Sequence, residues 1–133
     1  MADHDPASVA AQLYERFQSG DIDGVFDLLD ADATWELVGP AEIPYFGRYQ
    51  GRDNVERFFG LLGEHCVVED FGVDRITPTA DGAVAEGFER GHFSGKSASY
   101  DMRWCHVMTI VDGRIQRFTD YLDTAPMLVA WRS

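Results

Sequence analysis

The chain has 133 residues, a length that suits one domain with a proper buried core, and we expect a single domain over residues 1–133. Hydrophobic residues make up 45% and aromatic residues 13% of the sequence, which excludes an intrinsically disordered chain. The formal net charge of −12 argues against nucleic acids, anionic membranes and polyanionic ligands as partners, because all three favour basic surfaces.

The start of the chain, MADHDPASVAAQ, lacks the basic residues and the apolar run of a secretory signal. No stretch approaches the roughly 20 apolar residues of a membrane span. Cys66 and Cys105 lie far apart without the spacing of metal ligands, so we expect reduced cysteines that serve in packing. These features predict a cytoplasmic protein without a metal site.

Helical periodicity predicts two helices at the start of the chain. Asp5 and Pro6 suit the N-cap and the first residue of a helix that ends at Gly20. Asp21 can cap a second, shorter helix that continues to Leu29. Both helices have one apolar face, so we expect them to pack against the rest of the domain.

The middle of the chain combines a strand, a loop and a third helix. Residues 33–37 alternate apolar and polar, as in a short strand. The segment 41–51 has aromatic, Gly and Pro residues without a clear period, which predicts a loop that can cover a site. Asp53 and Glu56 form a capping box for a helix that runs to about Glu64.

The remainder of the chain has the period of two that is typical of strands. Strands are predicted over 67–79 and 83–94, followed by a long hairpin over 100–123 that turns at the dipeptide 112–113, Asp-Gly. Helices followed by antiparallel strands predict an α+β fold, with the helices on one face of a curved sheet that encloses a pocket.

The long hairpin carries the most reactive side chains. On its second arm, Asp120 falls between Phe118 and Leu122 on one face, and on its first arm His106 shares a face with Trp104. A carboxylate in apolar surroundings is exposed on a rim, paired, or kept as a working acid or base. His106 is the nearest candidate partner; alternatively, Asp120 lies on the outer face and His106 bonds a backbone group.

A second polar cluster lies in the preceding strand. Glu86, Arg90 and His92 share one face, which places an arginine and a histidine two residues apart and pointing the same way. The cluster is either part of a site or a solvated stripe, because an antiparallel sheet commonly has one wet face.

Three stretches together resemble a known superfamily: SGDIDGVFDLLDADATWEL, FGRYQGRDNVERFF and YDMRWCHVMTIVDGRIQRFTDYLDT. The chain looks like the nuclear transport factor-like superfamily, in particular its SnoaL-like branch of polyketide cyclases and ketosteroid isomerase-related proteins. The resemblance covers nearly the whole chain. It implies a cone-shaped α+β barrel with three N-terminal helices on a curved, mainly antiparallel sheet, and a homodimer. We expect the apolar tail over 126–131 to pack on the sheet or on the partner.

The resemblance also implies site residues. The catalytic positions of the steroid isomerase fall at Leu13, Leu37 and about Cys105, which argues against that mechanism here. The polyketide aldol cyclases resemble this chain better, because their acid/base aspartate and preceding histidine correspond to Asp120 and His106.

Limonene-type epoxide hydrolases provide the alternative. The resemblance places their catalytic groups at Asp120 and Arg90, with His92 in place of an aspartate, so that the three residues would organise a water for attack on an epoxide. From a different class, the domain would only bind a hydrophobic ligand or act as a dimeric scaffold.

We therefore predict a lyase or isomerase that acts on a small hydrophobic carbonyl or polyketide-like compound in an enclosed pocket. Asp120 would act as the acid/base, and His106 or Arg90 would hydrogen-bond the oxyanion. This chemistry needs neither a metal nor an organic cofactor. The residues predicted to contact the ligand are Tyr14, Trp35, Tyr45, Phe46, Trp104 and Phe118.

Overall fold

The computed structural model describes residues 5–133, which form four helices and six strands. The helices are α1 (Pro6–Gln18), α2 (Ile22–Phe26), α3 (Arg52–His65) and α4 (Thr124–Trp131). The strands are β1 (Leu29–Val38), β2 (Gly47–Gln50), β3 (Cys66–Pro78), β4 (Gly82–Phe93), β5 (Ser99–Val111) and β6 (Arg114–Leu122).

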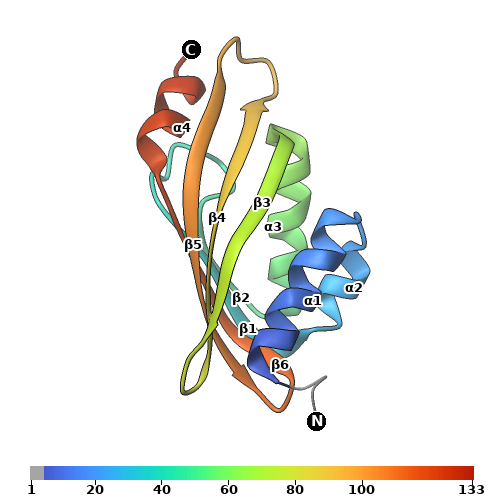
Figure 1. Cartoon of the computed structure of the whole chain (residues 1–133). Helices are drawn as coiled ribbons and strands as arrows, with labels where there is room; N and C mark the ends of the chain where they lie inside the picture. Colours follow the sequence, from blue (N-terminus) through green and yellow to red (C-terminus); the bar gives the residue numbers. More distant parts are fainter. Residues whose placement is uncertain (1–4) are drawn as a thin grey trace.

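The six strands form one curved sheet in the order β2-β1-β6-β5-β4-β3. All neighbouring strands are antiparallel except β1 and β6, which run parallel. Helices α1, α2 and α3 lie together on one side of the sheet, and α4 lies near one end of β5 (Figure 1). This arrangement confirms the predicted α+β fold with helices on one face of a mainly antiparallel sheet.

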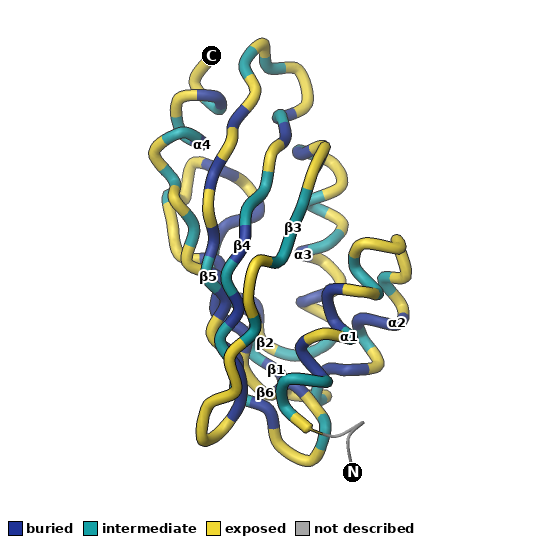
Figure 2. Tube along the Cα trace, in the orientation of Figure 1, coloured by how far each residue is buried: buried dark blue, intermediate teal, exposed yellow. Residues whose placement is uncertain are grey.

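The predicted long hairpin is present with the predicted turn and faces. Asp112 has a φ of 52° and Gly113 a φ of 77°, the positive values that a tight hairpin turn of this kind requires. Buried and exposed positions alternate along β5, so that one face is buried (Figure 2). The residues on its buried face are Tyr100, Met102, Trp104, His106, Met108 and Ile110.

Strand β4 has small residues on its buried face, which make room for large side chains from its neighbours. A Cβ atom on Gly87 would lie 2.3 Å from Trp104 Cζ2, and one on Gly91 would lie 2.8 Å from the Tyr100 hydroxyl. Both distances are far inside van der Waals contact. These two glycines therefore allow Trp104 and Tyr100 to lie flat across β4, and Glu89 lies between them on the same face.

The second helix and the first strand differ from their predicted ranges. Helix α2 ends at Phe26, and Leu29 already belongs to β1, beside Ile115 of β6. The pairing with β6 shifts register between Leu29 and Thr34, which accommodates the exposed residues Ala31 and Asp32 within the strand. Burial of Leu29 in the sheet thus outweighs the helical pattern of the preceding residues.

The segment 41–51 is irregular over residues 41–46, as predicted, and becomes a strand over residues 47–50. Its second half is β2, in which Tyr49 lies opposite Trp35 of β1, and Ile43 and Tyr45 in its first half are buried. Gly51, with a φ of 85°, precedes α3, and no side chain caps that helix. The predicted capping box at residues 53–56 is therefore wrong, because the N-cap is Gly51, two residues before the predicted N-cap Asp53.

The C-terminal segment packs on the sheet, as one of the two predicted alternatives states. Met127 and Ala130 of α4 are buried, and α4 contacts β5. Arg132 anchors the end of the chain to Glu42, with Nη2 and Oε1 2.5 Å apart. None of the helices in residues 5–133 is long and apolar enough to cross a membrane. The homodimer remains a prediction.

Candidate functional site

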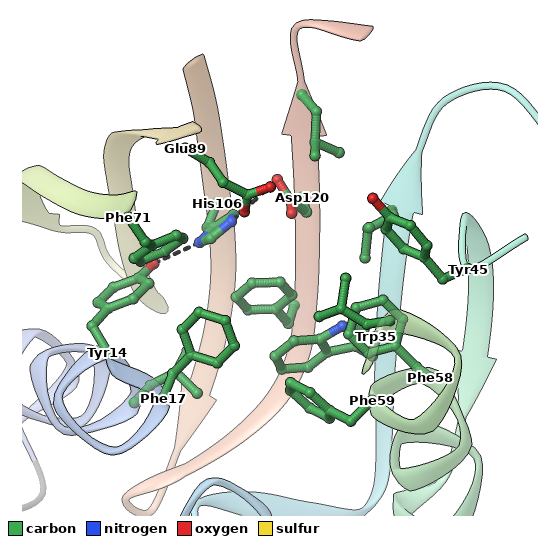
Figure 3. Close-up of a pocket in the computed structure, with 15 residues that line it drawn as sticks. Tyr14, Phe17, Trp35, Tyr45, Phe58, Phe59, Phe71, Glu89, His106 and Asp120 are labelled. Carbon is green, nitrogen blue, oxygen red and sulfur yellow. Dashed lines mark hydrogen bonds and ion pairs between the residues drawn. The ribbon is translucent and has the colours of Figure 1, made fainter. Parts of the chain in front are cut away.

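A cavity lies between the helices and the covered face of the sheet. The space in it that the centre of a water molecule can occupy is about 60 Å³, several times the roughly 10–15 Å³ that one buried water needs. Most of its wall is aromatic or aliphatic, and its polar side chains gather at one end (Figure 3). The lining residues include Tyr14, Phe17, Trp35, Tyr45, Phe58, Phe59, Phe71, Glu89, His106, Phe118 and Asp120.

His106 and Asp120 lie opposite each other on β5 and β6 and both point into the cavity. Their Nε2 and Oδ1 atoms are 3.1 Å apart, an ion-pair distance, although their orientation does not give standard hydrogen-bond geometry. Both side chains are buried, with relative exposures of 5% for His106 and 9% for Asp120. The predicted pairing is confirmed, and the alternative with Asp120 on the outer face is wrong.

Tyr14 of α1 completes a chain of three side chains. Its hydroxyl oxygen lies 2.8 Å from His106 Nδ1. Burial, with a smaller contribution from the Asp120 carboxylate, raises the pKa of Tyr14, so the phenol keeps its proton. We assign the imidazole proton to Nε2, because that nitrogen faces the Asp120 carboxylate, and with this tautomer the Tyr14 hydroxyl donates to Nδ1. We call this chain the Tyr14 relay: Tyr14, His106 and Asp120.

Trp104 holds the imidazole from behind and does not line the cavity. Its ring stacks on His106 with centroids 3.9 Å apart and an interplanar angle of 13°. Its Nε1 donates a hydrogen bond of 3.0 Å to the Phe88 carbonyl, which fixes the indole. The predicted direct contact of Trp104 with a ligand is thus corrected: the residue orients His106 instead.

Arg90 and His92 lie on the outer face of β4, away from Asp120. Arg90 Nη2 is 3.9 Å from an oxygen of Asp70, and His92 Nδ1 is 2.6 Å from an oxygen of Glu69. Since Glu89 points inward, the alternation of the strand turns its neighbours outward. The solvated-stripe interpretation is therefore correct, and the expectation that Arg90 and His92 join the site is wrong.

The remaining predicted ligand contacts divide into two groups. Tyr14, Trp35, Tyr45 and Phe118 line the cavity, and the Trp35 ring stacks on Phe118 with centroids 3.8 Å apart. Phe46 does not line the cavity; it packs over Gly39, where a Cβ atom would lie 2.3 Å from the Phe46 ring. Phe46 is buried and is therefore a core residue rather than a ligand contact.

Two buried hydrogen-bond donors on the cavity wall, Trp35 Nε1 and the Tyr45 hydroxyl, form no hydrogen bond of standard geometry within residues 5–133. The Tyr45 hydroxyl interacts only with the Cys66 thiol, a weak partner. An unsatisfied buried donor costs about 1–3 kcal/mol. A ligand oxygen within reach of either donor would remove part of that cost.

Glu89 is a site residue that the sequence reasoning missed. It lines the cavity, and the Tyr100 hydroxyl donates a hydrogen bond of 2.6 Å to its Oε2. Burial raises the pKa of Glu89 to about 7, opposed by the Tyr100 hydrogen bond and assisted by the charge of Asp120. Glu89 is the only charged residue on a strand face that otherwise has alanine, glycine and phenylalanine, which is the signal that identifies it.

Comparison of the sequence with known protein families identifies the family of this chain. Residues 10–118 match the family model of the SnoaL-like domain. The chain belongs to the SnoaL-like family. No curated protein is significantly similar to it in sequence.

Solved structures share the fold of this SnoaL-like domain at low sequence identity. An NTF2-like protein from Burkholderia thailandensis is 23% identical, with a TM-score of 0.88 and coverage of 97% of this chain and 98% of that one. An NTF2-like protein of unknown function from Burkholderia pseudomallei is 24% identical, with a TM-score of 0.87 and full coverage of both chains at 100%. A proposed polyketide cyclase from Pseudomonas putida is 20% identical, with a TM-score of 0.73 and coverage of 95% and 97%.

Within residues 5–133 of the SnoaL-like domain, no group of three or more His, Cys, Asp or Glu side chains is arranged to hold a metal ion. The polar end of the cavity instead consists of two carboxyls, an imidazole and phenols. Such groups can accept, donate and pass protons between neighbouring atoms.

Deprotonation of Glu89 is expected to lower the free energy of unfolding of the SnoaL-like domain as the pH rises from 4.5 to 7. Its ordinary pKa is 4.5 and its pKa in the folded state is about 7, so the folded state binds more protons than the unfolded state in this interval. The free energy of unfolding therefore decreases with rising pH. Urea unfolding at several pH values should show a flatter dependence for Glu89→Gln, which cannot titrate; equal slopes for both proteins would contradict this.

Proposed function

We propose that the protein is a lyase or isomerase of the aldol-cyclase or enol-isomerase type, which acts without a cofactor on a small hydrophobic carbonyl compound. The observation that carries this proposal is the Tyr14 relay, which ends in a carboxylate at the polar end of an otherwise apolar cavity. A weakly acidic C–H bond next to a carbonyl needs a positioned base in a dry site, and this arrangement supplies one.

Asp120 is the base that removes the proton next to the carbonyl. His106 faces Oδ1 from one side, and the imidazole is itself held by the Tyr14 hydroxyl and by stacking on Trp104. The imidazole therefore has a fixed orientation opposite the carboxylate, and such positioning favours proton transfer. The Tyr45 hydroxyl also lines the cavity, and it supplies a hydrogen bond to the oxygen on which negative charge develops.

The aromatic wall determines the kind of substrate. The Trp35 ring stacks on Phe118 and also contacts Phe58, with centroids 5.8 Å apart. Flat aromatic surfaces favour a ringed or conjugated apolar compound. The described residues that line the cavity include neither lysine nor arginine, so a strongly anionic substrate is disfavoured.

The polyketide cyclase named above fits this chemistry, as does a structure named as an isomerase from Bacillus subtilis, which shares the fold at 20% identity and a TM-score of 0.79. An LEH-like epoxide hydrolase from M. tuberculosis also shares the fold, at 21% identity and a TM-score of 0.72. Here, however, Arg90 and His92 lie on the outer face, so the groups that were expected to organise water with Asp120 are missing from the cavity. The geometry favours proton abstraction over attack on an epoxide.

The test is proton exchange in D₂O. A panel of small cyclic ketones and 1,3-diketones is incubated with the protein, and loss of the signals of the protons next to the carbonyl is followed by ¹H NMR. We expect exchange faster than in buffer for at least one aromatic or bicyclic member. Binding of panel members, seen by ligand line broadening, without any accelerated exchange would overturn the proposal in favour of a binding domain.

A further inference from the structure

Two carboxyl groups, rather than one, face the polar end of the cavity. We propose that Glu89 and Asp120 hold one proton between them, and that Glu89 delivers it to the substrate oxygen that becomes a hydroxyl group. This inference rests on the proposed aldol-type function and adds a second catalytic residue to it.

The topology brings the two carboxyls together. Glu89 on β4 and Asp120 on β6 flank β5, from which His106 points into the same cavity. Their carboxyl groups point toward one another in Figure 3, and the charge of Asp120 reaches Glu89 strongly enough to raise the pKa of that carboxyl. Two like charges in a dry site repel each other, so retention of one proton is favoured.

Glu89 has its own chain of hydrogen bonds, separate from the Tyr14 relay. Tyr100 donates to Glu89 Oε2 over 2.6 Å, and Cys66 Sγ lies 3.1 Å from the Tyr100 hydroxyl. Because the single phenolic proton of Tyr100 goes to Glu89, the Cys66 thiol is the donor to the Tyr100 oxygen. Burial raises the pKa of Cys66 to about 11, so the thiol has a proton to donate. We call this chain the Cys66 relay: Cys66, Tyr100 and Glu89.

Gly91 provides the space that the Tyr100 phenol of the Cys66 relay occupies. A Cβ atom on Gly91 would lie 2.5 Å from the Val67 carbonyl oxygen and 2.8 Å from the Tyr100 hydroxyl, so a larger residue would push the phenol away from Glu89. Tyr100 itself is 2% exposed. Each carboxyl is thus held by a buried phenol, through His106 for Asp120 and directly for Glu89.

The other titratable side chains near Glu89 do not take up the proton that the two carboxyls share. The titratable side chains that face it are Tyr45 from the segment before β2, Cys66 from β3, Tyr100 and His106 from β5, and Asp120 from β6. Both phenols and the thiol keep their protons because burial raises their pKa values. Both nitrogens of His106 face other groups, Nδ1 the Tyr14 hydroxyl and Nε2 Asp120. Asp120 is therefore the acid/base partner of Glu89 among the described residues of the cavity.

With one proton shared between the two carboxyls, the catalytic cycle needs no other acid or base. Asp120 takes the proton from the C–H bond, and the resulting enolate carbon forms a C–C bond with a second carbonyl, whose π electrons move to its oxygen. That alkoxide takes the proton of Glu89 and becomes a hydroxyl group. Asp120 is now protonated and Glu89 ionised, and transfer of one proton between them restores the starting state.

Carboxyl-resolved ¹³C NMR titration tests the shared proton directly. Removing the neighbouring charge in Asp120→Asn should lower the midpoint of Glu89 by about one pH unit, because coupled sites interact by at least that amount. Removing the hydrogen bond to the ionised form in Tyr100→Phe should raise the midpoint. Asp70→Asn removes a carboxylate on the outer face, beside Arg90, and should leave the midpoint unchanged.

A Glu89 midpoint that does not move in Asp120→Asn would overturn the inference, whatever the activity of the protein. Tyr100→Phe tests only the hydrogen bond that Glu89 accepts from Tyr100. If Asp120→Asn fails to fold, Asp120→Ser removes the same charge and gives a second test of the shared proton. The titration uses no substrate. Failure of the proposed function and failure of the carboxyl pair are therefore seen in different experiments.

The catalytic part of the inference is tested by separating two steps. Exchange of the proton next to a carbonyl needs Asp120 alone, whereas retro-aldol cleavage of a β-hydroxy ketone that releases a fluorescent aryl aldehyde needs both carboxyls. Glu89→Gln should keep the exchange rate and lose about 100-fold or more of the cleavage rate. Equal losses in both assays, or no loss of cleavage, would show that Glu89 is not the proton donor.

Discussion

Replacing Asp120 with asparagine is expected to slow α-proton exchange by about 10²- to 10⁴-fold, the range that a positioned general base contributes. The amide has the same shape as the carboxylate and an oxygen that can still face His106, but it cannot accept the substrate proton. The rate is measured by ¹H NMR in D₂O with the best substrate of the carbonyl panel. An unchanged rate would show that another group is the base.

A matched control separates the chemistry from general effects of charge and folding. Asp74→Asn removes a carboxylate on the exposed outer side, where it pairs with Arg103 over 2.8 Å, and it should leave the exchange rate unchanged. Since Asp120 is buried, its replacement also alters stability, and the melting temperature of each variant is measured alongside the rate. Loss of rate with an intact melting transition identifies a catalytic role.

The hairpin at the centre of the site could be predicted because local signals determine it. The Asp112 and Gly113 pair requires a tight turn, and strict alternation then fixes which side chains share a face. Together they place His106 opposite Asp120 without any knowledge of the other strands. A long, regular hairpin is therefore the most readable part of this chain.

The face of β4 that points inward could not be predicted from its own sequence. Its polar face, with Arg90 and His92, suggested a site, but the opposite face with glycine and alanine is the buried one. The reason is that Trp104 and Tyr100 of β5 fill the space above those small residues. A strand face with few large side chains is buried when its neighbours supply the volume, and Glu89 was missed for this reason.

Contacts between distant segments were the other part that sequence reasoning could not supply. Tyr14 was expected to contact the ligand, but its bond to His106 spans 92 residues and depends on how α1 is oriented on the sheet. The segment 41–51 was expected to be a lid, yet it is fixed by pairing of β2 with β1. Both outcomes follow from tertiary packing, which local patterns do not encode.

Trp104→Ala is expected to be the most destabilising of these substitutions, with a loss of about 3–5 kcal/mol in the free energy of unfolding. Trp104 is 3% exposed and is stacked between His106, at 3.9 Å, and Phe71, at 5.1 Å between ring centroids. Below it lies Gly87, which has no side chain that could fill the vacated space. Urea unfolding measures the loss, and Trp131→Ala, at the partly exposed end of α4, should lose less.

Trp104→Phe distinguishes the volume of the indole from its role in holding His106. Phenylalanine restores much of the buried surface, so most of the stability should return, but it cannot donate to the Phe88 carbonyl as Trp104 does over 3.0 Å. If Trp104 also orients the imidazole, Trp104→Phe should slow α-proton exchange more than its stability loss explains. A variant with recovered stability and a wild-type rate would show that the Tyr14 hydroxyl alone is sufficient to hold His106 against Asp120.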